Sequence, residues 1–148
     1  MRVIIAGSHG LIGSALVRHL HEGGHDVVRL VRHEVRGADE IAWDPDAGRL
    51  DAADLAGADA VVNLGGAGVG DRRWTAAYRR TVLQSRTRPT SLLARTLAEV
   101  DGGPRVLLQG SAVGFYGDRG EEVLTEASPG GTGFLADVVR AWEDSTGA

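Results

Sequence analysis

The sequence predicts an α/β fold in which helices cover both faces of a doubly wound parallel sheet. A strand pattern over residues 2–6, apolar from Val3 onward, breaks at a glycine, and an amphipathic helix follows. A second apolar run, over residues 58–64, also ends in a glycine-rich loop. Apolar strands then alternate with helical patterns along the whole chain, which is the order that a parallel sheet with crossover helices requires. The expected architecture is therefore of the Rossmann type.

The first half of the chain supplies three strands and one long helix. After the first strand, apolar residues recur at helical spacing until a pair of glycines at 23 and 24 ends the helix. Strands are expected over residues 26–31 and 40–43, and Pro45 predicts a turn at the end of the latter strand. The apolar residues of the helix are Leu11, Ile12, Ala15, Leu16 and Leu20.

The second half continues the alternation. A short helix is expected over residues 50–55 and a buried strand over residues 58–64. A long helix runs from Thr75 to about Val100, and Pro89 is expected to kink it or split it in two. A fifth strand over residues 105–109, an irregular loop over residues 110–133 and a helix over residues 134–145 complete the chain.

The turn after the first strand has the GxxGxxG spacing of a dinucleotide-binding turn. Gly7 permits the tight turn, Gly10 lets a pyrophosphate approach the backbone, and Gly13 lets the helix lie close to the strand. The free N–H groups of the new helix would then face the phosphates. A purely structural loop is the alternative, but the complete strand–helix–strand frame favours nucleotide binding.

Composition narrows the class of protein. The 148 residues make one domain with no visible boundary, no secretory signal and no apolar stretch of membrane-spanning length, so we expect a soluble, cytoplasmic protein with no membrane partner. Cysteine is absent, which excludes thiolate catalysis within the chain, and the net charge of −4 disfavours nucleic acid as a partner. All 16 basic residues are arginine. Chemistry that needs a lysine is therefore excluded within this chain.

Arg32 points to the choice of cofactor. It follows the second strand, where folds that prefer NAD place an acidic residue for the ribose 2′-hydroxyl. A guanidinium forms a charge-assisted pair with a 2′-phosphate, whereas a carboxylate repels it. The position therefore favours NADP(H) over NAD(H), and a solvated loop arginine is the alternative.

A strongly basic segment, from Arg72 to Arg88, follows the second glycine loop. Most of its arginines are expected on a solvated helix face. Arg86 is the exception that a helix leaving the loop can aim at cofactor phosphates. Nucleic-acid binding is the rival interpretation, which the acidic whole disfavours.

The histidines do not predict a metal site. His19, His21 and His25 lie two or more positions apart around a helix end, with no cysteine or carboxylate pattern beside them, so we expect surface histidines. His9, in the glycine turn, is either a cleft residue or a spectator.

Ser111 and Tyr116 are the candidate catalytic residues. Ser111 directly follows the fifth strand, at the sheet edge where open α/β sheets bind ligands. Its hydroxyl can face a substrate or satisfy loop backbone groups, and both alternatives stay open. Tyr116 is either a cleft residue or a packing residue.

Several later motifs together resemble those of one family. They are Trp43-Asp44-Pro45, Asn63-Leu64-Gly65-Gly66, Arg73-Trp74, Ser85-Arg86, the run from Ser111 to Gly117, Glu126 with Ser128-Pro129, and Trp142-Glu143. With the glycine turn, they resemble the epimerase-family proteins of the extended, atypical short-chain dehydrogenase/reductase class, including NAD-dependent epimerases and dehydratases and nucleoside-diphosphate-sugar epimerases. The resemblance covers nearly the whole chain.

The resemblance implies a cofactor site and a chemistry. It implies NADP(H) held by the glycine turn, with Arg32 on the 2′-phosphate and with three further contacts at Leu64, Gly65 and Arg86; Thr81 is a weaker candidate. It implies hydride transfer on a nucleotide sugar or another small carbonyl substrate, with Ser111 and Tyr116 polarising that substrate. The turn residues are Gly7, Ser8, Gly10, Leu11, Ile12 and Gly13.

The chain departs from the family in two respects. Short-chain dehydrogenases carry a YxxxK pair on the helix after the serine-bearing strand, and here Phe134 and Val138 fall at those places. Family members are also about twice as long, so the chain is expected to be the cofactor-binding part of a larger protein, lacking the substrate lobe. A non-catalytic NADPH sensor or scaffold is therefore the alternative function. The unpaired sheet edge left by such a truncation leads us to expect a homo-oligomer.

Overall fold

The computed structural model describes residues 1–147 and confirms the predicted α/β architecture. Five parallel strands form one sheet in the order β3-β2-β1-β4-β5. The strands are β1 (Arg2–Ala6), β2 (Asp26–Val31), β3 (Glu40–Ala42), β4 (Ala60–Asn63) and β5 (Val106–Gln109). The order reverses between β1 and β4, which creates the switch point at which open α/β sheets bind ligands.

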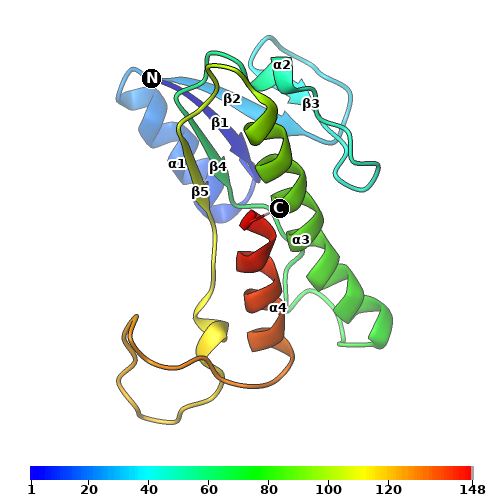
Figure 1. The fold of residues 1–148 in the computed structure, drawn as a ribbon, viewed down its shortest axis with the longest axis vertical. Helices are drawn as coiled ribbons and strands as arrows, with labels where there is room; N and C mark the ends of the chain where they lie inside the picture. Colours follow the sequence, from blue (N-terminus) through cyan, green and yellow to red (C-terminus); the bar gives the residue numbers. More distant parts are fainter. Residues whose placement is uncertain (148) are drawn as a thin grey trace.

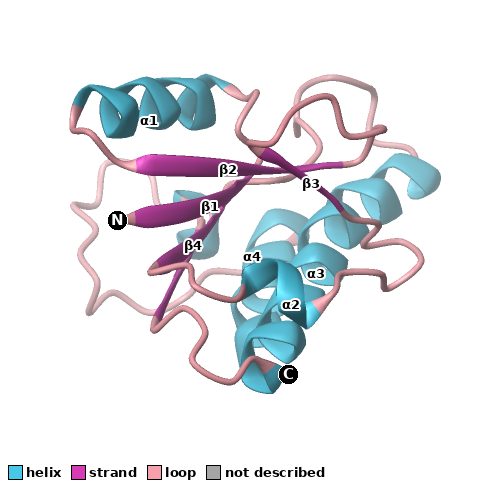
Figure 2. Cartoon of the chain, turned by 90° about the horizontal axis from the view of Figure 1, so that it is seen from above, coloured by secondary structure: helices cyan, strands magenta, loops and turns pink. Residues whose placement is uncertain are grey.

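Helices cover both faces of the sheet. Helix α1 (Leu11–Glu22) lies alone on one face, and α2 (Ala52–Leu55), α3 (Ala76–Glu99) and α4 (Phe134–Asp144) lie on the other, as Figure 2 shows. Two short 3₁₀ turns, η1 (Val113–Tyr116) and η2 (Ser145–Gly147), complete the elements. The segment between η1 and α4 extends away from the sheet at one end of the molecule (Figure 1).

The alternation of side chains along β1 explains why its sequence is apolar from Val3 to Ala6. Val3 and Ile5 pack on the α1 face, and Ile4 and Ala6 pack on the α3 face. Because both faces of a parallel sheet are covered, no position of the strand can be polar without burying a polar side chain. Ile4 and Ile5 are both fully buried.

The structure decides two details of the sequence prediction. Of the two outcomes expected at Pro89, a kink or a split of the long helix, the split does not occur, because α3 runs as one helix from Ala76 to Glu99. A proline removes one helical hydrogen bond, and here its ring is buried against the rest of the fold, which offsets that loss. Leu11 and Ile12 do not join the buried face of α1. They are 91% and 68% exposed, since the helix packs on the sheet through Gly13 and Val17.

No helix of residues 1–147 combines the length and the apolarity that a bilayer crossing demands.

Candidate functional site

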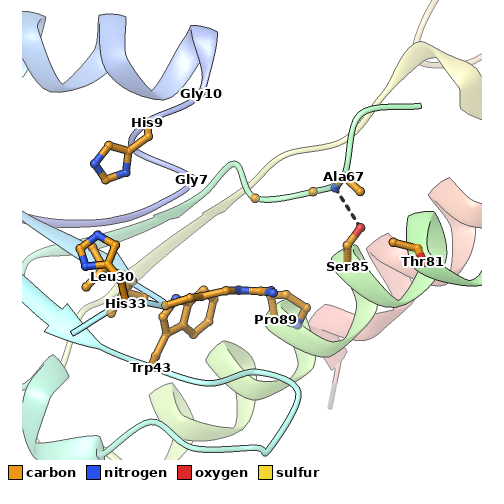
Figure 3. Close-up of a pocket in the computed structure, with 14 residues that line it drawn as sticks. Gly7, His9, Gly10, Leu30, His33, Trp43, Ala67, Thr81, Ser85 and Pro89 are labelled. Atoms are coloured by element: carbon orange, nitrogen blue, oxygen red, sulfur yellow. Dashed lines mark hydrogen bonds between the residues drawn. The ribbon is translucent and has the colours of Figure 1, made fainter. Parts of the chain in front are cut away.

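A cleft of about 450 Å³ lies at the carboxyl ends of the central strands. This volume falls within the range of small-molecule sites, about 300–1,000 Å³. The first glycine turn and the β4–α3 loop form two of its sides, and α3 and Trp43 lie opposite the turn (Figure 3). Its lining residues are Gly7, His9, Gly10, Leu30, Val31, Arg32, His33, Trp43, Gly65, Gly66, Ala67, Thr81, Ser85 and Pro89.

Close backbone packing requires two of the three glycines of the turn. Gly7 has a φ of +80°, and a Cβ there would lie 2.7 Å from the carbonyl carbon of Leu64. A Cβ at Gly13 would overlap the carbonyl oxygen of Gly7. At Gly10 the nearest atom would be 3.4 Å away, so the protein itself leaves room for a side chain. A ligand that approaches the backbone closely would occupy this space beside Gly10.

The first turn of α1 has the character of an anion site. Gly10 caps the helix without a side-chain hydrogen bond, and the first turn holds no acidic residue. The first backbone N–H groups of a helix have no partner within it and carry the positive end of the helix dipole. Ser8 is buried beneath this turn, and its hydroxyl lies 3.3 Å from Nδ1 of His9. The residues present therefore fit a bound phosphate.

The β4–α3 loop forms the other side of the cleft, and side chains of α3 hold it. Ala67 donates its N–H to Ser85 Oγ at 3.0 Å, and its carbonyl accepts from Arg86 Nη1 at 3.0 Å. Tyr78 donates its hydroxyl to the carbonyl of Gly68 at 2.5 Å. These bonds give a loop without regular structure a defined position. Sequence reasoning did not identify Ser85 as a lining residue.

Arg86 lies behind the loop rather than in the cleft. Its guanidinium lies 5.2 Å from the ring centroid of Trp142 and close behind Gly66. Partial burial lowers the pKa of Arg86 below its ordinary value. In this arrangement Arg86 supports the loop. Of the other positions expected from the family resemblance, Gly65 and Thr81 line the cleft, and Leu64 packs with the apolar residues on the α1 face.

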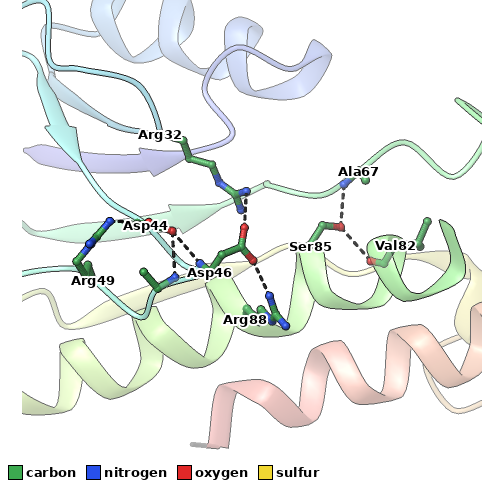
Figure 4. A network of polar contacts seen from close by, with 9 residues as sticks. Arg32, Asp44, Asp46, Arg49, Ala67, Val82, Ser85 and Arg88 are labelled. Atoms are coloured by element: carbon green, nitrogen blue, oxygen red, sulfur yellow. Dashed lines mark hydrogen bonds and ion pairs between the residues drawn. The ribbon is translucent and has the colours of Figure 1, made fainter. Parts of the chain in front are cut away.

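Arg32 lies at the other end of the cleft, at the tip of β2. The rings of His9 and His33 lie beside it with centroids 6.3 Å apart, and Trp43 is buried below. The side chain of Arg32 is 52% exposed and pairs with Asp46. Figure 4 shows this pair together with Arg88, which the sequence did not connect with Arg32. The tip of β2 therefore presents a cation to the cleft.

Ser111 and Tyr116 come together, but in a different hollow. A space of about 530 Å³ is lined by these two residues with Ala112, Val113, Phe115, Glu126 and Glu143. Ser111 donates its hydroxyl proton to Glu143 Oε1 at 2.5 Å. Neither Ser111 nor Tyr116 lines the cleft of the glycine turn. Sequence reasoning had quoted Glu126 and Glu143 in motifs without giving them a role.

Phe134 and Val138, at the places of the family's tyrosine and lysine, serve in packing. Phe134 makes an edge-to-face contact with Trp74 at 5.3 Å, and the guanidinium of Arg79 lies over both rings. Val138 is buried in α4. At these two places of α4 the side chains make aromatic and apolar contacts.

Metal ligands do not gather in the part of the chain that the structure describes. No group of three or more histidine, aspartate or glutamate side chains there is arranged to hold an ion. His19 and His21 lie near the end of α1, and His25 lies just beyond it.

Comparison with known proteins identifies related chains. The model of the NAD dependent epimerase/dehydratase family matches residues 3–133. An epimerase family protein of Mycobacterium bovis is 42% identical over 144 residues, which are 97% of this chain and 47% of that protein. The human epimerase family protein SDR39U1 is 34% identical over 146 residues, covering 97% of this chain and 48% of the relative. The chain thus spans about half the length of the curated relatives it matches.

Solved structures show the same architecture. The nucleoside-diphosphate sugar epimerase of Corynebacterium glutamicum aligns with a TM-score of 0.84 at 41% identity, covering 99% of this chain and 30% of that one. Human SDR39U1, solved with NADPH, aligns with a TM-score of 0.87 at 32% identity, covering 99% of this chain and 48% of that one.

Proposed function

Because the chain belongs to the NAD-dependent epimerase/dehydratase family, we propose that it is an NADP(H)-binding domain. One observation carries the choice of cofactor. The guanidinium of Arg32 lies at the mouth of the cleft, at the tip of the strand that follows the glycine turn. The similar human protein, solved with NADPH, supports the same choice.

Each part of the cleft suits one part of the dinucleotide. The first turn of α1 would hold the pyrophosphate on its free N–H groups, and Gly10 leaves room for it. Arg32 would pair with the 2′-phosphate, where a charge-assisted contact is stronger than a neutral one. The apolar surfaces of Trp43 and Pro89 would lie against the parts of the dinucleotide that carry no phosphate.

When bound, the cofactor supplies a hydride. Hydride transfer on a nucleotide sugar or another small carbonyl compound is the family's chemistry that we propose for the whole protein. Ser111 and Tyr116 would polarise the substrate carbonyl, and for this Ser111 would have to turn its single hydroxyl proton from Glu143 to the substrate.

A non-catalytic NADPH sensor or scaffold is the second candidate, and the environment of α4 favours it. Phe134 and Val138 offer neither a phenol nor an ammonium group, and the proton of Ser111 is directed to Glu143. This candidate predicts that the chain oxidises no NADPH in the presence of nucleotide sugars. Oxidation above the rate of a Gly10→Glu variant, whose side chain blocks the pyrophosphate, would contradict it.

Calorimetric titration of the chain with NADPH and NADH tests the proposed cofactor. NADPH should bind more tightly than NADH. The Arg32→Ala variant should bind NADPH about tenfold to hundredfold more weakly, as expected from the loss of a charged contact of roughly 1.5–3 kcal/mol. Arg18→Ala, which removes an exposed arginine of α1 outside the cleft, should change neither affinity. Equal affinities for NADH and NADPH would overturn the proposal.

A further inference from the structure

Arg32 shares its counter-ion with a second arginine from a distant part of the chain. Asp46 Oδ2 lies 3.6 Å from Arg32 Nη1, and Asp46 Oδ1 accepts a hydrogen bond from Arg88 Nη1 at 2.9 Å. Arg88 belongs to α3, whereas Asp46 belongs to the turn after β3 (Figure 4). A carboxylate thus lies between two guanidinium groups beside the proposed 2′-phosphate site.

The backbone of Asp46 is held in place by the preceding aspartate. Asp44 Oδ1 accepts from the N–H groups of Asp46 and Ala47, both at 3.1 Å, and Asp44 Oδ2 accepts from Arg49 Nη2 at 2.8 Å. Asp44 and Arg49 also exchange two backbone hydrogen bonds. These bonds within the turn fix the backbone from which the carboxylate of Asp46 projects toward Arg32 and Arg88.

The two contacts of Asp46 differ in strength. The contact with Arg88 has the length of a hydrogen bond, whereas the contact with Arg32 is too long for one and is an ion pair only. The side chain of Arg32 is also half exposed, which leaves it free to turn. A phosphate monoester carries about −1.5 to −2 charges at neutral pH, more than a carboxylate. The phosphate can therefore displace Asp46 from Arg32 but has less effect on the bond to Arg88.

We propose that Asp46 is a specificity-determining residue that competes with the 2′-phosphate for Arg32, and that Arg88 is a positioning residue that retains Asp46 when Arg32 turns to the phosphate. The inference rests on the proposed binding of NADP(H). It makes the preference for NADPH over NADH depend on a residue that need not touch the cofactor.

Three variants of this chain test the inference by titration with NADPH and NADH at low ionic strength. The Asp46→Asn variant should bind NADPH about twofold to fivefold more tightly, the range expected from removing one exposed ion pair, and its affinity for NADH should not change. Arg88→Ala should weaken NADPH by a similar factor, because Asp46 then pairs with Arg32 alone. In the double variant, the loss caused by Arg88→Ala should fall below about twofold, since no carboxylate remains to be restrained.

Two control variants each remove one charge of the same sign at a position away from Asp46 and Arg88. Arg95→Ala takes an exposed arginine from the same helix, and Asp101→Asn takes an exposed aspartate from the turn after it. Neither should alter the ratio of the two affinities. If Asp46→Asn does not fold, Asp46→Ala replaces it, and a thermal melt of each variant establishes folding.

The outcomes separate this inference from the proposed function. Weaker NADPH binding by Asp46→Asn, equal changes for NADPH and NADH, or an equal cost of Arg88→Ala in both backgrounds would overturn the role of Asp46. In each of these cases a tenfold or greater loss for Arg32→Ala would leave the proposed function standing. No binding of either dinucleotide by the parent chain would overturn both.

Discussion

The backbone of Gly13 packs so closely against Gly7 that a Cβ at position 13 would overlap the carbonyl oxygen of Gly7. Gly13 lies in the first turn of α1, and Gly7 is the first residue of the turn that follows β1. The contact sets the distance between α1 and β1, and it thereby fixes where the N-terminus of α1 lies at the edge of the cleft.

This contact predicts different outcomes for two neighbouring glycines. Gly13→Ala should lower the free energy of unfolding by about 1–3 kcal/mol, the usual cost of overpacking, in urea denaturation. Gly10→Ala meets nothing closer than 3.4 Å and should cost less than about 1 kcal/mol. If the cleft binds a pyrophosphate, Gly10→Ala should instead weaken dinucleotide binding. Equal stability losses in the two variants would contradict the conclusion that position 13, and not position 10, needs a glycine for packing.

A buried hydroxyl joins three elements of the fold. Thr90 Oγ1 accepts from Asn63 Nδ2 and from Trp142 Nε1, both at 3.1 Å, and donates to the carbonyl of Arg86 at 2.8 Å. Thr90→Val keeps the shape but leaves the indole N–H without this partner, so the free energy of unfolding should fall by about 1–3 kcal/mol.

Thr87 provides the matched control on the same helix. Its hydroxyl donates only to the carbonyl of Leu83, so Thr87→Val should change the free energy of unfolding by less than about 0.5 kcal/mol. Chemical denaturation followed by tryptophan fluorescence measures both variants. A Thr90→Val variant as stable as Thr87→Val would refute the role of this hydroxyl.

The ionisation of Asp44 should make the free energy of unfolding depend on pH in the acid range. The N–H of Ala47, with further help from Arg49 and the N–H of Asp46, holds the pKa of the Asp44 carboxyl below its ordinary value of 3.8, despite partial desolvation. Because the folded state has the lower pKa, the stabilisation is present above pH 3.8 and is lost as the pH falls through the lowered value.

Asp44→Asn should therefore flatten the loss of stability below pH 3.8. Arg49→Gln, which removes one of the causes of the lowered pKa, should flatten it partly. Denaturation midpoints measured from pH 5 to pH 2 give the slope. An Asp44→Asn variant with the slope of the parent chain would show that this carboxyl makes no such contribution.

The edge strand β5 predicts self-association. Leu108 is 57% exposed and Val106 is 46% exposed, and among residues 1–147 the strand β5 pairs with β4 only. An unpaired edge with exposed apolar side chains favours contact with another chain. We expect a dimer or larger assembly by light scattering, and Leu108→Lys should shift it toward the monomer. A monomeric parent chain at high concentration would contradict this prediction.

Local patterns predicted the elements well, and longer-range packing accounts for the differences. The strand over residues 2–6 and the parallel sheet are confirmed, and the four buried positions of that strand, Val3 to Ala6, are apolar because both faces of the sheet are covered there. Periodicity placed Leu11 and Ile12 on the buried face of α1, but nothing in a periodic pattern says where the sheet beneath a helix ends. The site residues named from the sequence remain predictions, and the structure gathers the glycine turn, Arg32, Gly65 and Thr81 around one cleft.

The sequence by itself determined the glycine turn and the order of strands and helices, because the residues that decide them are neighbours along the chain. Only the tertiary structure separated Arg32 from Arg86, both of which the sequence named as contacts of the cofactor: Arg32 lines the cleft, and Arg86 lies behind the β4–α3 loop. The direction of a long side chain depends on what surrounds its element: Arg86 finds the carbonyl of Ala67 and the ring of Trp142, and Arg32 finds an open cleft. For the same reason Asp46 and Arg88, 42 positions apart, meet only in the folded chain.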